Sequence, residues 1–539
     1  MLTYLALITF FLACIAYRRW RRISISNVPG PECKSFLYGN LLEFLGGQAG
    51  EIDFKWREKY GDVFRIRASL GEDRLFIADP KAIQYIYHIA SYSFPKAKAR
   101  RQISRLLFGP GLSNVDGDVH KRQRKIMLPG FGGPESKAFV PIFSQCAEKM
   151  CNKWKDEIEL STDQSIVLDV TSWISRATLD AIGYAAFDYS FGALDVSDNQ
   201  LTKAYTNLFF DIFGIPSKAS ILSLSVMEHL PRAVVAFLMR HVPGRLTRGI
   251  LVNKLTTAVA KDLFKEKSEA LLSGKGRRDI MSLLVKANAS GNSKTRLPED
   301  ELLAQMNTII LAGHETTANT LCFGLWEFCR HPEIQRKLRR EIHSTERAIR
   351  NNGCTEFTSS DLDSMPYLCA VVKETLRYHP PVYNVSRVSG QDNVLPLSKP
   401  ITTTSGKILH ELPIPKGLQI ISSVAAYNRN KDIFGEDADV FNPERWLRES
   451  VPSTTVSLGV YGSLFTFTGG ARSCIGWRFA VLEMQMFLVQ LVGSFEFSMA
   501  WDKDIRREAT LVMTPTTEGE VEKGSLLRLK IKMTQRDEL

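Results

Sequence analysis

The sequence predicts a mainly α-helical domain with small β-sheets and a long central helix, preceded by an N-terminal membrane anchor helix. Three observations favour this fold class: an apolar N-terminus followed by arginines, one long apolar helical run, and only short segments of strand-like character. The 539 residues contain no internal repeat and no linker long enough to separate domains, so one large unit is expected after the anchor.

The composition is that of an ordinary globular protein, with 44% hydrophobic and 24% charged residues. Disordered chains and disulfide scaffolds are thereby excluded. Lys and Arg outnumber Asp and Glu by 69 to 58, which suits a membrane surface or an acidic partner. No nucleic-acid motif accompanies this charge, so we expect no nucleic-acid binding. Nine cysteines, an odd number without a CxxC pair, indicate a reduced, cytosol-facing domain.

Residues 1–22 are expected to form a transmembrane anchor with a basic flank. Leu2–Tyr17 is apolar apart from two threonines and would span roughly 24 Å as a helix. Four arginines and Trp20 follow and can reach the headgroups. A cleaved signal peptide, the alternative, carries its positive charge before the apolar run. The positive-inside rule then predicts a single-pass protein whose remainder is cytosolic.

Two further stretches concern the ends of the main domain, which is predicted over residues 41–539. Residues 23–40, with Pro29-Gly30-Pro31, are expected to be a stiff, proline-rich hinge. The last four residues, Arg536 to Leu539, resemble an endoplasmic-reticulum retrieval tail, which is read only in the lumen. Because the predicted orientation places this tail in the cytosol, chance similarity is the preferred interpretation.

The central helix is predicted to begin at Pro298, where Pro and three acidic residues suit a helix N-terminus. Its apolar pattern continues from Leu302 to Cys329 and stops before His331-Pro332. A helix this long and apolar is expected to cross the middle of a large domain. Strands are predicted at Val63–Arg67, Arg74–Ala78, Leu418–Ser422 and Leu526–Ile531.

The most informative stretch runs from Phe467 to Gly476 and contains Cys474 between glycines, just before an apolar helical pattern. Backbone N–H groups, a nearby cation and the helix dipole favour a thiolate at such a position. A thiolate of this kind can serve as the axial ligand of haem iron. Taken alone, Cys474 would more readily be an inert buried cysteine.

This stretch resembles the haem-binding loop of the cytochrome P450 superfamily, whose pattern Phe-x-x-Gly-x-Arg-x-Cys-x-Gly is met at every fixed position. The resemblance extends over nearly the whole chain. It implies the P450 fold and a haem b whose iron is ligated by Cys474, with Phe467 and Arg472 in the cofactor site. Together with the anchor, the resemblance implies a microsomal enzyme of the endoplasmic-reticulum membrane. The residues around His120 and Cys474 resemble those of fungal members.

Glu374-Thr-Leu-Arg377 fits the family's Glu-x-x-Arg, and the two charged side chains lie on one helical face. The segment from Phe441 to Trp446 resembles the one that adds a second arginine, here Arg445. The resemblance implies a buried triad of Glu374, Arg377 and Arg445 that supports the Cys474 loop. A surface pair of little energetic value is the alternative for Glu374 and Arg377 alone.

The segment from Ala312 to Thr317 resembles the family's oxygen-activation motif on the central helix. The resemblance implies that Thr316 hydrogen-bonds oxygen, that Glu315 relays protons, and that Gly313 leaves room for oxygen. The alternative for Thr316 is a helix-interior threonine bonded to the carbonyl four residues back.

Cations are expected around the haem propionates. The resemblance implies Arg472 in the loop, Arg124 at the family's Trp-x-x-x-Arg spacing, and Arg387 ten residues past Arg377. His120 stands where the family has Trp and can still donate a hydrogen bond. A solvated surface charge is the alternative for each arginine.

The family reading is a monooxygenase that uses O2 and electrons from NADPH. Because the chain shows no flavin or nicotinamide module, the electrons are expected from a separate NADPH-cytochrome P450 reductase, with cytochrome b5 as a second candidate. Basic residues near His120, such as Lys121, Arg122 and Lys125, suit docking to an acidic partner. Two rival functions stay open: a haem-thiolate isomerase or dehydratase without NADPH, and a non-catalytic haem- or lipid-binding membrane protein.

A lipophilic small-molecule substrate, such as a terpenoid, a sterol or another secondary metabolite, is expected from the apolar residues at family pocket positions. These include Phe209, Phe210, Phe213, Ile309 and Val382. The expected pocket segments are Arg100–Gly117, Leu208–Phe237, Asn307–Ala312, Val382–Val385 and Met513–Thr516. The alternative is that these side chains belong to the core.

Overall fold

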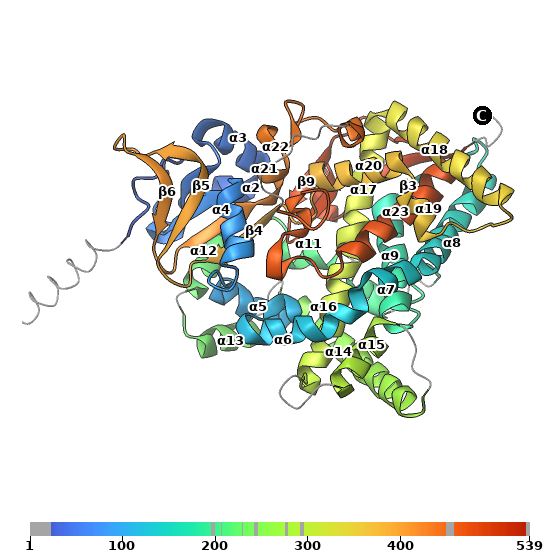
Figure 1. The fold of residues 1–539 in the computed structure, drawn as a ribbon, viewed down its shortest axis with the longest axis horizontal. Helices are drawn as coiled ribbons and strands as arrows, with labels where there is room; N and C mark the ends of the chain where they lie inside the picture. Colours follow the sequence, from blue (N-terminus) through green and yellow to red (C-terminus); the bar gives the residue numbers. More distant parts are fainter. Residues whose placement is uncertain are drawn as a thin grey trace, which may run out of the picture.

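The computed structural model describes residues 23–195, 200–205, 207–228, 230–241, 246–274, 279–290, 296–448 and 458–534. Within these ranges the chain is mainly helical with small sheets, as predicted. Figure 1 shows most strands gathered on one side of the molecule and most long helices on the other. The expected anchor (1–22) and the last four residues lie outside the described ranges.

The helices have the following bounds: α2 (Leu41–Gly46), α3 (Glu51–Tyr60), α4 (Pro80–Gln84), α5 (Lys98–Phe108), α6 (Gly117–Met127), α7 (Gly133–Ala138), α8 (Val140–Glu159), α9 (Val170–Phe187), α10 (Gln200–Tyr205), α11 (Leu208–Phe213), α12 (Lys218–Met227), α13 (Arg232–His241), α14 (Leu246–Leu272), α15 (Ile280–Ser290), α16 (Glu299–Gly313), α17 (Glu315–Arg330), α18 (Pro332–Asn351), α19 (Ser359–Asp363), α20 (Pro366–Tyr378), α21 (Val424–Asn428), α22 (Lys431–Phe434) and α23 (Trp477–Ser494). Short turns that matter below are η2 (Tyr85–Ile89), which is π-helical, and the 3-10 turns η5 (Pro443–Leu447), η6 (Phe465–Phe467) and η7 (Gly470–Arg472).

The strands are β1 (Val63–Arg67), β2 (Asp73–Ile77), β3 (Ser165–Asp169), β4 (Asn384–Val388), β5 (Asn393–Thr402), β6 (Ile408–Ile414), β7 (Gln419–Ser423), β8 (Phe495–Met499), β9 (Ile505–Ala509), β10 (Met513–Thr517) and β11 (Arg528–Met533). They form a four-stranded sheet β1-β2-β7-β4, a three-stranded sheet β3-β11-β8, and the pairs β5-β6 and β9-β10. In the largest sheet only the β2–β7 pair is parallel. The four predicted strands are present, with shifts of at most two residues at their ends.

The predicted central helix is present but broken. It ends as α16 at Gly313 and resumes as α17 at Glu315, so His314 separates two helices instead of lying within one. The hydroxyl of Thr178 on α9 donates to the His314 carbonyl at 3.2 Å. The His314 ring also enters the ladder: its Nδ1 lies 2.7 Å from the Ile310 carbonyl oxygen, which the His314 N–H reaches only at 3.4 Å. Side-chain hydrogen bonds that enter the backbone ladder weaken it locally, which accounts for a break that apolar periodicity does not reveal.

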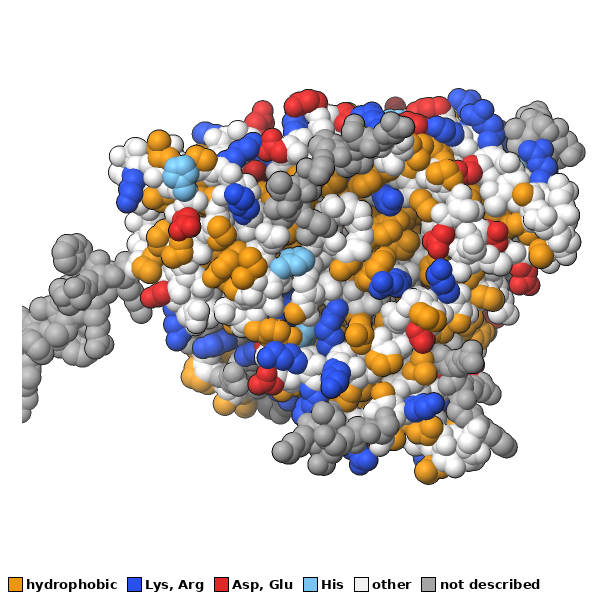
Figure 2. All heavy atoms as spheres, viewed as in Figure 1, with side chains coloured by type: hydrophobic (Ala, Val, Ile, Leu, Met, Phe, Trp, Pro, Cys, Tyr) orange, Lys and Arg blue, Asp and Glu red, His pale blue; other side chains and the backbone are white. Residues whose placement is uncertain are grey.

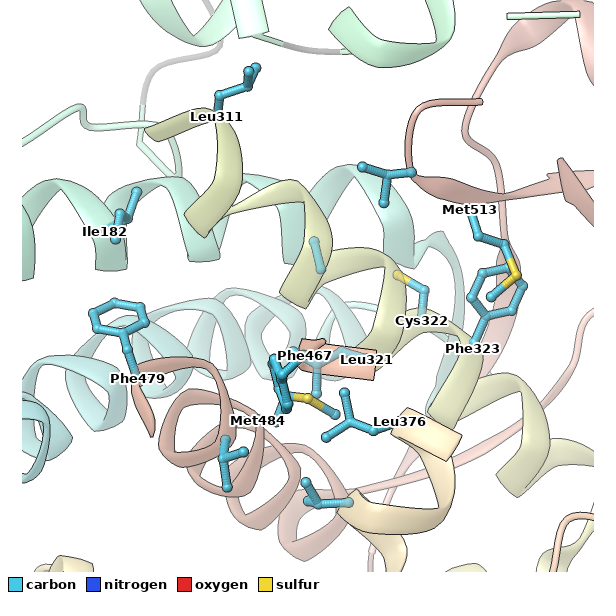
Figure 3. Packing of buried hydrophobic residues seen from close by; sticks show 14 of the residues in the cluster. Ile182, Leu311, Leu321, Cys322, Phe323, Leu376, Phe467, Phe479, Met484 and Met513 are labelled. Atoms are coloured by element: carbon cyan, nitrogen blue, oxygen red, sulfur yellow. The ribbon is translucent and has the colours of Figure 1, made fainter. Parts of the chain in front are cut away.

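The main hydrophobic core surrounds this broken helix. Figure 3 shows Leu321 on α17 turned toward Phe467 and Met484, while Phe323 faces Met513. Ile182 on α9 lies on another side of the same helix. Helices α9 and α23 and strand β10 therefore pack around α17, which places the segment with the oxygen-activation pattern in the interior.

The segment expected as a hinge is held against the domain. Ile25 and Val28 are buried in the main core, and the N–H of Arg65 on β1 donates to the Pro29 carbonyl at 2.8 Å. A β-carbon at Gly30 would lie 1.9 Å from the Arg65 carbonyl oxygen, so the backbones approach as closely as glycine allows. Residues 25–30 are thus packed against the core and the edge of the large sheet.

Charge is dispersed on the face shown in Figure 2, where Lys and Arg side chains lie scattered among apolar and acidic ones. In the part of the chain that the structure describes, no single helix is long and apolar enough to cross a membrane. One sharply bent pair, Leu201–Phe213 with Lys218–Met227, meets that test by length and composition.

Candidate functional site

Cys474 lies between η7 and the start of α23, three residues before Trp477. Its backbone N–H donates to the Phe467 carbonyl at 2.8 Å, which closes the loop from Phe467 to Gly476, called the Cys474 loop below. Cys474 is exposed although its neighbour Ser473 is buried. Protein nevertheless surrounds the sulfur closely enough for burial to raise the pKa of the thiol.

Two groups act against that burial, as the sequence predicted: a hydrogen bond from the Gly476 backbone and the positive charge of Arg124 lower the pKa of Cys474. Burial outweighs them, so the free thiol keeps its proton at neutral pH. A metal ion bound to sulfur would displace that proton, because a coordinating thiol is deprotonated.

The glycines of the loop are required by close backbone contacts. A β-carbon at Gly469 would lie 2.1 Å from the Leu458 carbonyl oxygen. Gly470 has a φ of +63°, and a β-carbon there would lie 2.1 Å from the Tyr87 carbonyl oxygen. These contacts explain why the pattern that precedes Cys474 is rich in glycine.

The side chain of Arg472 is buried, and its guanidinium group lies next to a carboxylate. Its Nη1 lies 2.6 Å from Oδ1 of Asp116, and its Nε donates to the Ser91 carbonyl at 3.4 Å. Nη2 is buried without a hydrogen-bond partner among the described residues. An unpaired guanidinium N–H of this kind is suited to a further anion.

His120 and Arg124 lie on α6, one helical turn apart. His120 is buried with Nδ1 3.1 Å from the Tyr92 hydroxyl, and burial together with Arg472, Lys96 and Arg124 lowers its pKa to about 3. It is therefore a neutral hydrogen-bonding group. Arg124 donates to the carbonyl oxygen and hydroxyl of Ser473 at 2.7 and 3.1 Å, so it contacts the Cys474 loop directly.

Arg387 lies on β4 with its guanidinium 5.2 Å from the ring centre of Tyr87. Two cations that sequence reasoning did not assign join this group, Lys96 and Arg100. Burial lowers the pKa of Lys96 to about 7, and repulsion from Arg387, Arg472 and Arg100 contributes. Burial and Arg387 lower the pKa of Arg100. The only signal for either was the basic run from Lys96 to Arg101.

These cations outnumber the carboxylates near them, since Asp116 already serves both Arg472 and Arg101. Haem carries two carboxylates, and its iron accepts a thiolate ligand. The Nη2 of Arg472, which has no partner among the described residues, the mutual repulsion around Lys96 and the exposed Cys474 therefore fit that group. The residues expected to hold the propionates, namely Arg472, His120, Arg124 and Arg387, are brought together around one region.

The oxygen-activation pattern lies at the break between α16 and α17. Glu315 is buried, its Oε2 has no hydrogen-bond partner in the described ranges, and burial raises its pKa to about 8. The carboxyl group is therefore protonated at neutral pH. Thr316 donates its hydroxyl to the Ala312 carbonyl at 2.7 Å, which is the helix-interior bond of the alternative reading. A β-carbon at Gly313 would lie 2.9 Å from the Ile182 side chain, so Gly313 permits close packing on α9.

The expected triad forms a fully buried network. Arg377 donates to both carboxylate oxygens of Glu374 at 2.8 Å, and Arg445 donates to Oε1 at 3.1 Å. Trp446 adds an indole N–H at 2.9 Å, and Asp437 binds Arg445 at 2.7 Å; neither contact was predicted. Every lone pair of Glu374 therefore has a donor within reach, which makes its burial tolerable.

A hydrogen bond joins the triad helix to the Cys474 loop. The Thr466 hydroxyl donates to the Leu376 carbonyl at 2.8 Å, and Asn428 donates to the Thr466 hydroxyl at 2.8 Å. Leu376 precedes Arg377 on α20, and Thr466 precedes Phe467. Phe467 itself is buried in the main core. The triad is thus placed to support the loop.

Some of the residues expected to line a substrate pocket lie in the core, and others join neighbouring elements. Phe209 and Ile309 are buried in the main core, and Phe209 packs on Phe213 with ring centres 6.4 Å apart. Asn307 is hydrogen-bonded to Asn253 on α14 at 2.5 Å. The N–H of Met513 donates to the Pro381 carbonyl at 2.7 Å, so the segments that begin at 382 and 513 lie together.

The comparisons with known proteins agree with one another. The family model described as Cytochrome P450 matches residues 28–522. Cytochrome P450 monooxygenase 205 of Postia placenta is 34% identical, with 98% of each chain covered. Ganoderic acid synthetase CYP5150L8 of Ganoderma lucidum is 34% identical over 96% of each chain. Cytochrome P450 monooxygenase claP of Ampulloclitocybe clavipes is 32% identical, covering 98% of this chain and 96% of its own.

Proposed function

The chain belongs to the cytochrome P450 family and is a monooxygenase, and from this premise we propose that it inserts one oxygen atom into a lipophilic small molecule with electrons from NADPH. The observation that supports this most is the exposed Cys474 beside a cluster of cations, in which Nη2 of Arg472 has no hydrogen-bond partner among the described residues and Lys96 is repelled by Arg387, Arg472 and Arg100. The electrons would come through a separate membrane-bound reductase, with cytochrome b5 as a second donor.

The chain's residues would divide the work as follows. Cys474 would ligate the iron, while Arg472, His120, Arg124, Arg387, Lys96 and Arg100 would neutralise or hydrogen-bond the two carboxylates of haem. Haem supplies the activation of dioxygen when bound. Glu374, Arg377 and Arg445 would support the loop and take no part in the reaction, because their charged groups are paired with one another.

Proton supply would fall to the break in the central helix. Glu315 holds a proton at neutral pH and has an unpartnered carboxyl oxygen, so it can donate where an aqueous carboxylate could not. Thr316 lies next to it and would have to release the Ala312 carbonyl before its hydroxyl could bind oxygen. A reversible helix hydrogen bond of this kind costs little to exchange.

The substrate we propose is a terpenoid, a sterol or a similar secondary metabolite. The support is a relative named as a ganoderic acid synthetase, together with the partly buried apolar side chain of Phe213, which packs on Phe209. The protein would be anchored in the endoplasmic-reticulum membrane through residues 1–22, followed by the proline-rich segment 23–40, part of which packs on the domain, and a cytosolic catalytic domain over 41–539.

The first experiment is the carbon monoxide difference spectrum of the reduced, full-length protein in microsomes. Thiolate-ligated haem gives a long-wavelength Soret band, which Cys474→Ser should abolish. The absence of haem from folded protein would contradict the proposal. Product formation with reductase should require NADPH; a product that forms without NADPH would instead indicate an isomerase or dehydratase. Thr316→Ala should consume NADPH with less product, whereas unchanged coupling would remove the role proposed for Thr316.

A further inference from the structure

A π-helical turn lies against the Cys474 loop. This turn, η2, covers Tyr85–Ile89, and its closing bond runs from the Ala90 N–H to the Tyr85 carbonyl at 2.8 Å. Turns of this kind are rare, and they occur often at functional sites because the extra residue re-aims the side chains around it. In this chain the turn presents His88 to the segment that leads into the loop.

His88 makes one well-formed hydrogen bond. Its Nε2 lies 2.8 Å from the carbonyl oxygen of Leu458. Because a carbonyl oxygen can only accept, the ring must carry its proton on Nε2 and donate it. Leu458 is fully buried, whereas His88 is exposed. A surface side chain therefore holds a backbone group of the interior.

The same bond is enclosed by the loop's own backbone. A β-carbon at Gly469 would lie 2.2 Å from Nε2 of His88 and 2.1 Å from the Leu458 carbonyl oxygen. A β-carbon at Gly470 would lie 3.0 Å from the Cα of His88. Gly469 and Gly470 thus let the loop pass directly over the His88 hydrogen bond.

Neighbours of His88 also contact the loop. The Tyr87 ring packs edge-on against Phe465 with ring centres 5.0 Å apart. The Ser91 carbonyl accepts from Nε of Arg472 at 3.4 Å. Residues 87–91 therefore contact Phe465 just before the loop, and then the glycines and Arg472 of the loop itself.

We propose that His88 is a positioning residue for Cys474. The hydrogen bond from its Nε2–H to the Leu458 carbonyl holds the segment before the loop against η2. This bond thereby fixes the position of the loop backbone and of the Cys474 sulfur. Nothing in the family pattern around Cys474 includes this residue. The inference rests on the proposed haem-thiolate function for its spectroscopic readout, but the placement of the loop can also be measured without haem.

The test compares full-length wild type with His88→Ala, His88→Gln and His410→Ala. The glutamine amide can still donate to the Leu458 carbonyl, and His410 is an exposed histidine on β6, away from the loop. In the reduced carbon monoxide complex, His88→Ala should raise the fraction without the thiolate band about fivefold, the factor expected for one lost hydrogen bond. His88→Gln should restore most of the wild-type ratio, and His410→Ala should match wild type.

Hydrogen exchange supplies the second readout. Amides of residues 458–476, including the Cys474 N–H, should exchange several-fold faster in His88→Ala, while the thermal midpoint stays near that of His410→Ala. Wild-type exchange and spectra in His88→Ala would overturn the proposal, as would a glutamine variant no better than alanine. If the wild type itself binds no haem, the proposed function fails, and the exchange comparison still decides whether His88 positions the loop.

Discussion

Arg124 reaches across from α6 to hold the residue that precedes Cys474. Its Nη1 lies 2.7 Å from the Ser473 carbonyl oxygen and its Nη2 lies 3.1 Å from the Ser473 hydroxyl. The positive charge of the same side chain lowers the pKa of Cys474. One arginine thus fixes the loop backbone and offsets part of the burial that disfavours the thiolate.

Arg124→Gln should therefore reduce the thiolate-ligated fraction of the reduced carbon monoxide complex about tenfold, as expected for the loss of a charged hydrogen bond. Arg122→Gln is the matched control, because Arg122 lies on the same helix and pairs with Glu301 at 2.7 Å, away from the loop. Its spectrum should equal that of wild type. An Arg124→Gln variant with a full thiolate band would show that Ser473 is held by other contacts.

Proton delivery should depend on the protonated form of Glu315. Its pKa is raised to about 8 by burial, so the acid is present below that pH and is lost as the pH rises through it. The amount of product formed per NADPH consumed should therefore decrease as the pH rises through about 8. Glu315→Gln keeps the burial but removes the proton, and it should lower the product-forming rate about a hundredfold and abolish this pH dependence. Unchanged coupling in the glutamine variant would exclude Glu315 as the donor.

Breaking the buried triad should be costly. Glu374→Ala leaves Arg377 buried without a carboxylate and Arg445 with Asp437 alone, and it should lower the free energy of unfolding by about 3–5 kcal/mol. The exposed pair of Lys399 and Asp432 offers a comparison, since Lys399→Ala should change stability by less than about 1 kcal/mol. Chemical denaturation of both variants measures the difference. Equal effects would mean that the triad contributes no more than a surface pair.

Acid should destabilise the domain partly through His379. Burial lowers its pKa from 6.5 to about 4, and its Nε2 lies 2.8 Å from Oε1 of buried Glu327. In the unfolded chain, His379 therefore binds a proton below about pH 6.5. In the folded chain, it binds that proton only below about pH 4. Stability from this group is complete above 6.5 and declines as the pH falls through that window, by up to about 1.4 kcal/mol per pH unit.

His379→Gln can still donate to Glu327 but cannot titrate. Its free energy of unfolding should fall less steeply than that of wild type between pH 6.5 and 4, as measured by urea denaturation at several pH values. His410→Ala, a change at an exposed histidine, should keep the wild-type slope. Parallel curves for wild type and His379→Gln would show that folding does not change the pKa of His379.

Local patterns carried most of what could be known in advance. The spacing of Phe467, Arg472 and Cys474 identified the loop, and Glu374 with Arg377 identified the triad helix. Strand-like runs located β1 and β2 to within one residue. All of these patterns could be recognised because they are formed by residues close together in the chain. The break at His314 was missed because apolar periodicity does not record the side-chain hydrogen bonds that reach its backbone, one from the His314 ring and one from Thr178 on another helix.

The sequence by itself determined the family, the mainly helical class and the residue types of the site, since these are written in short, strictly spaced motifs. Only the tertiary structure decided which charges meet. It gathers Lys96 and Arg100 with Arg387 and Arg472 and brings His88 to the Leu458 carbonyl. It also buries Glu315 with one carboxyl oxygen that has no hydrogen-bond partner in the described ranges. The physical reason is that desolvation and charge repulsion depend on the distance between side chains, and packing sets that distance between residues far apart in sequence.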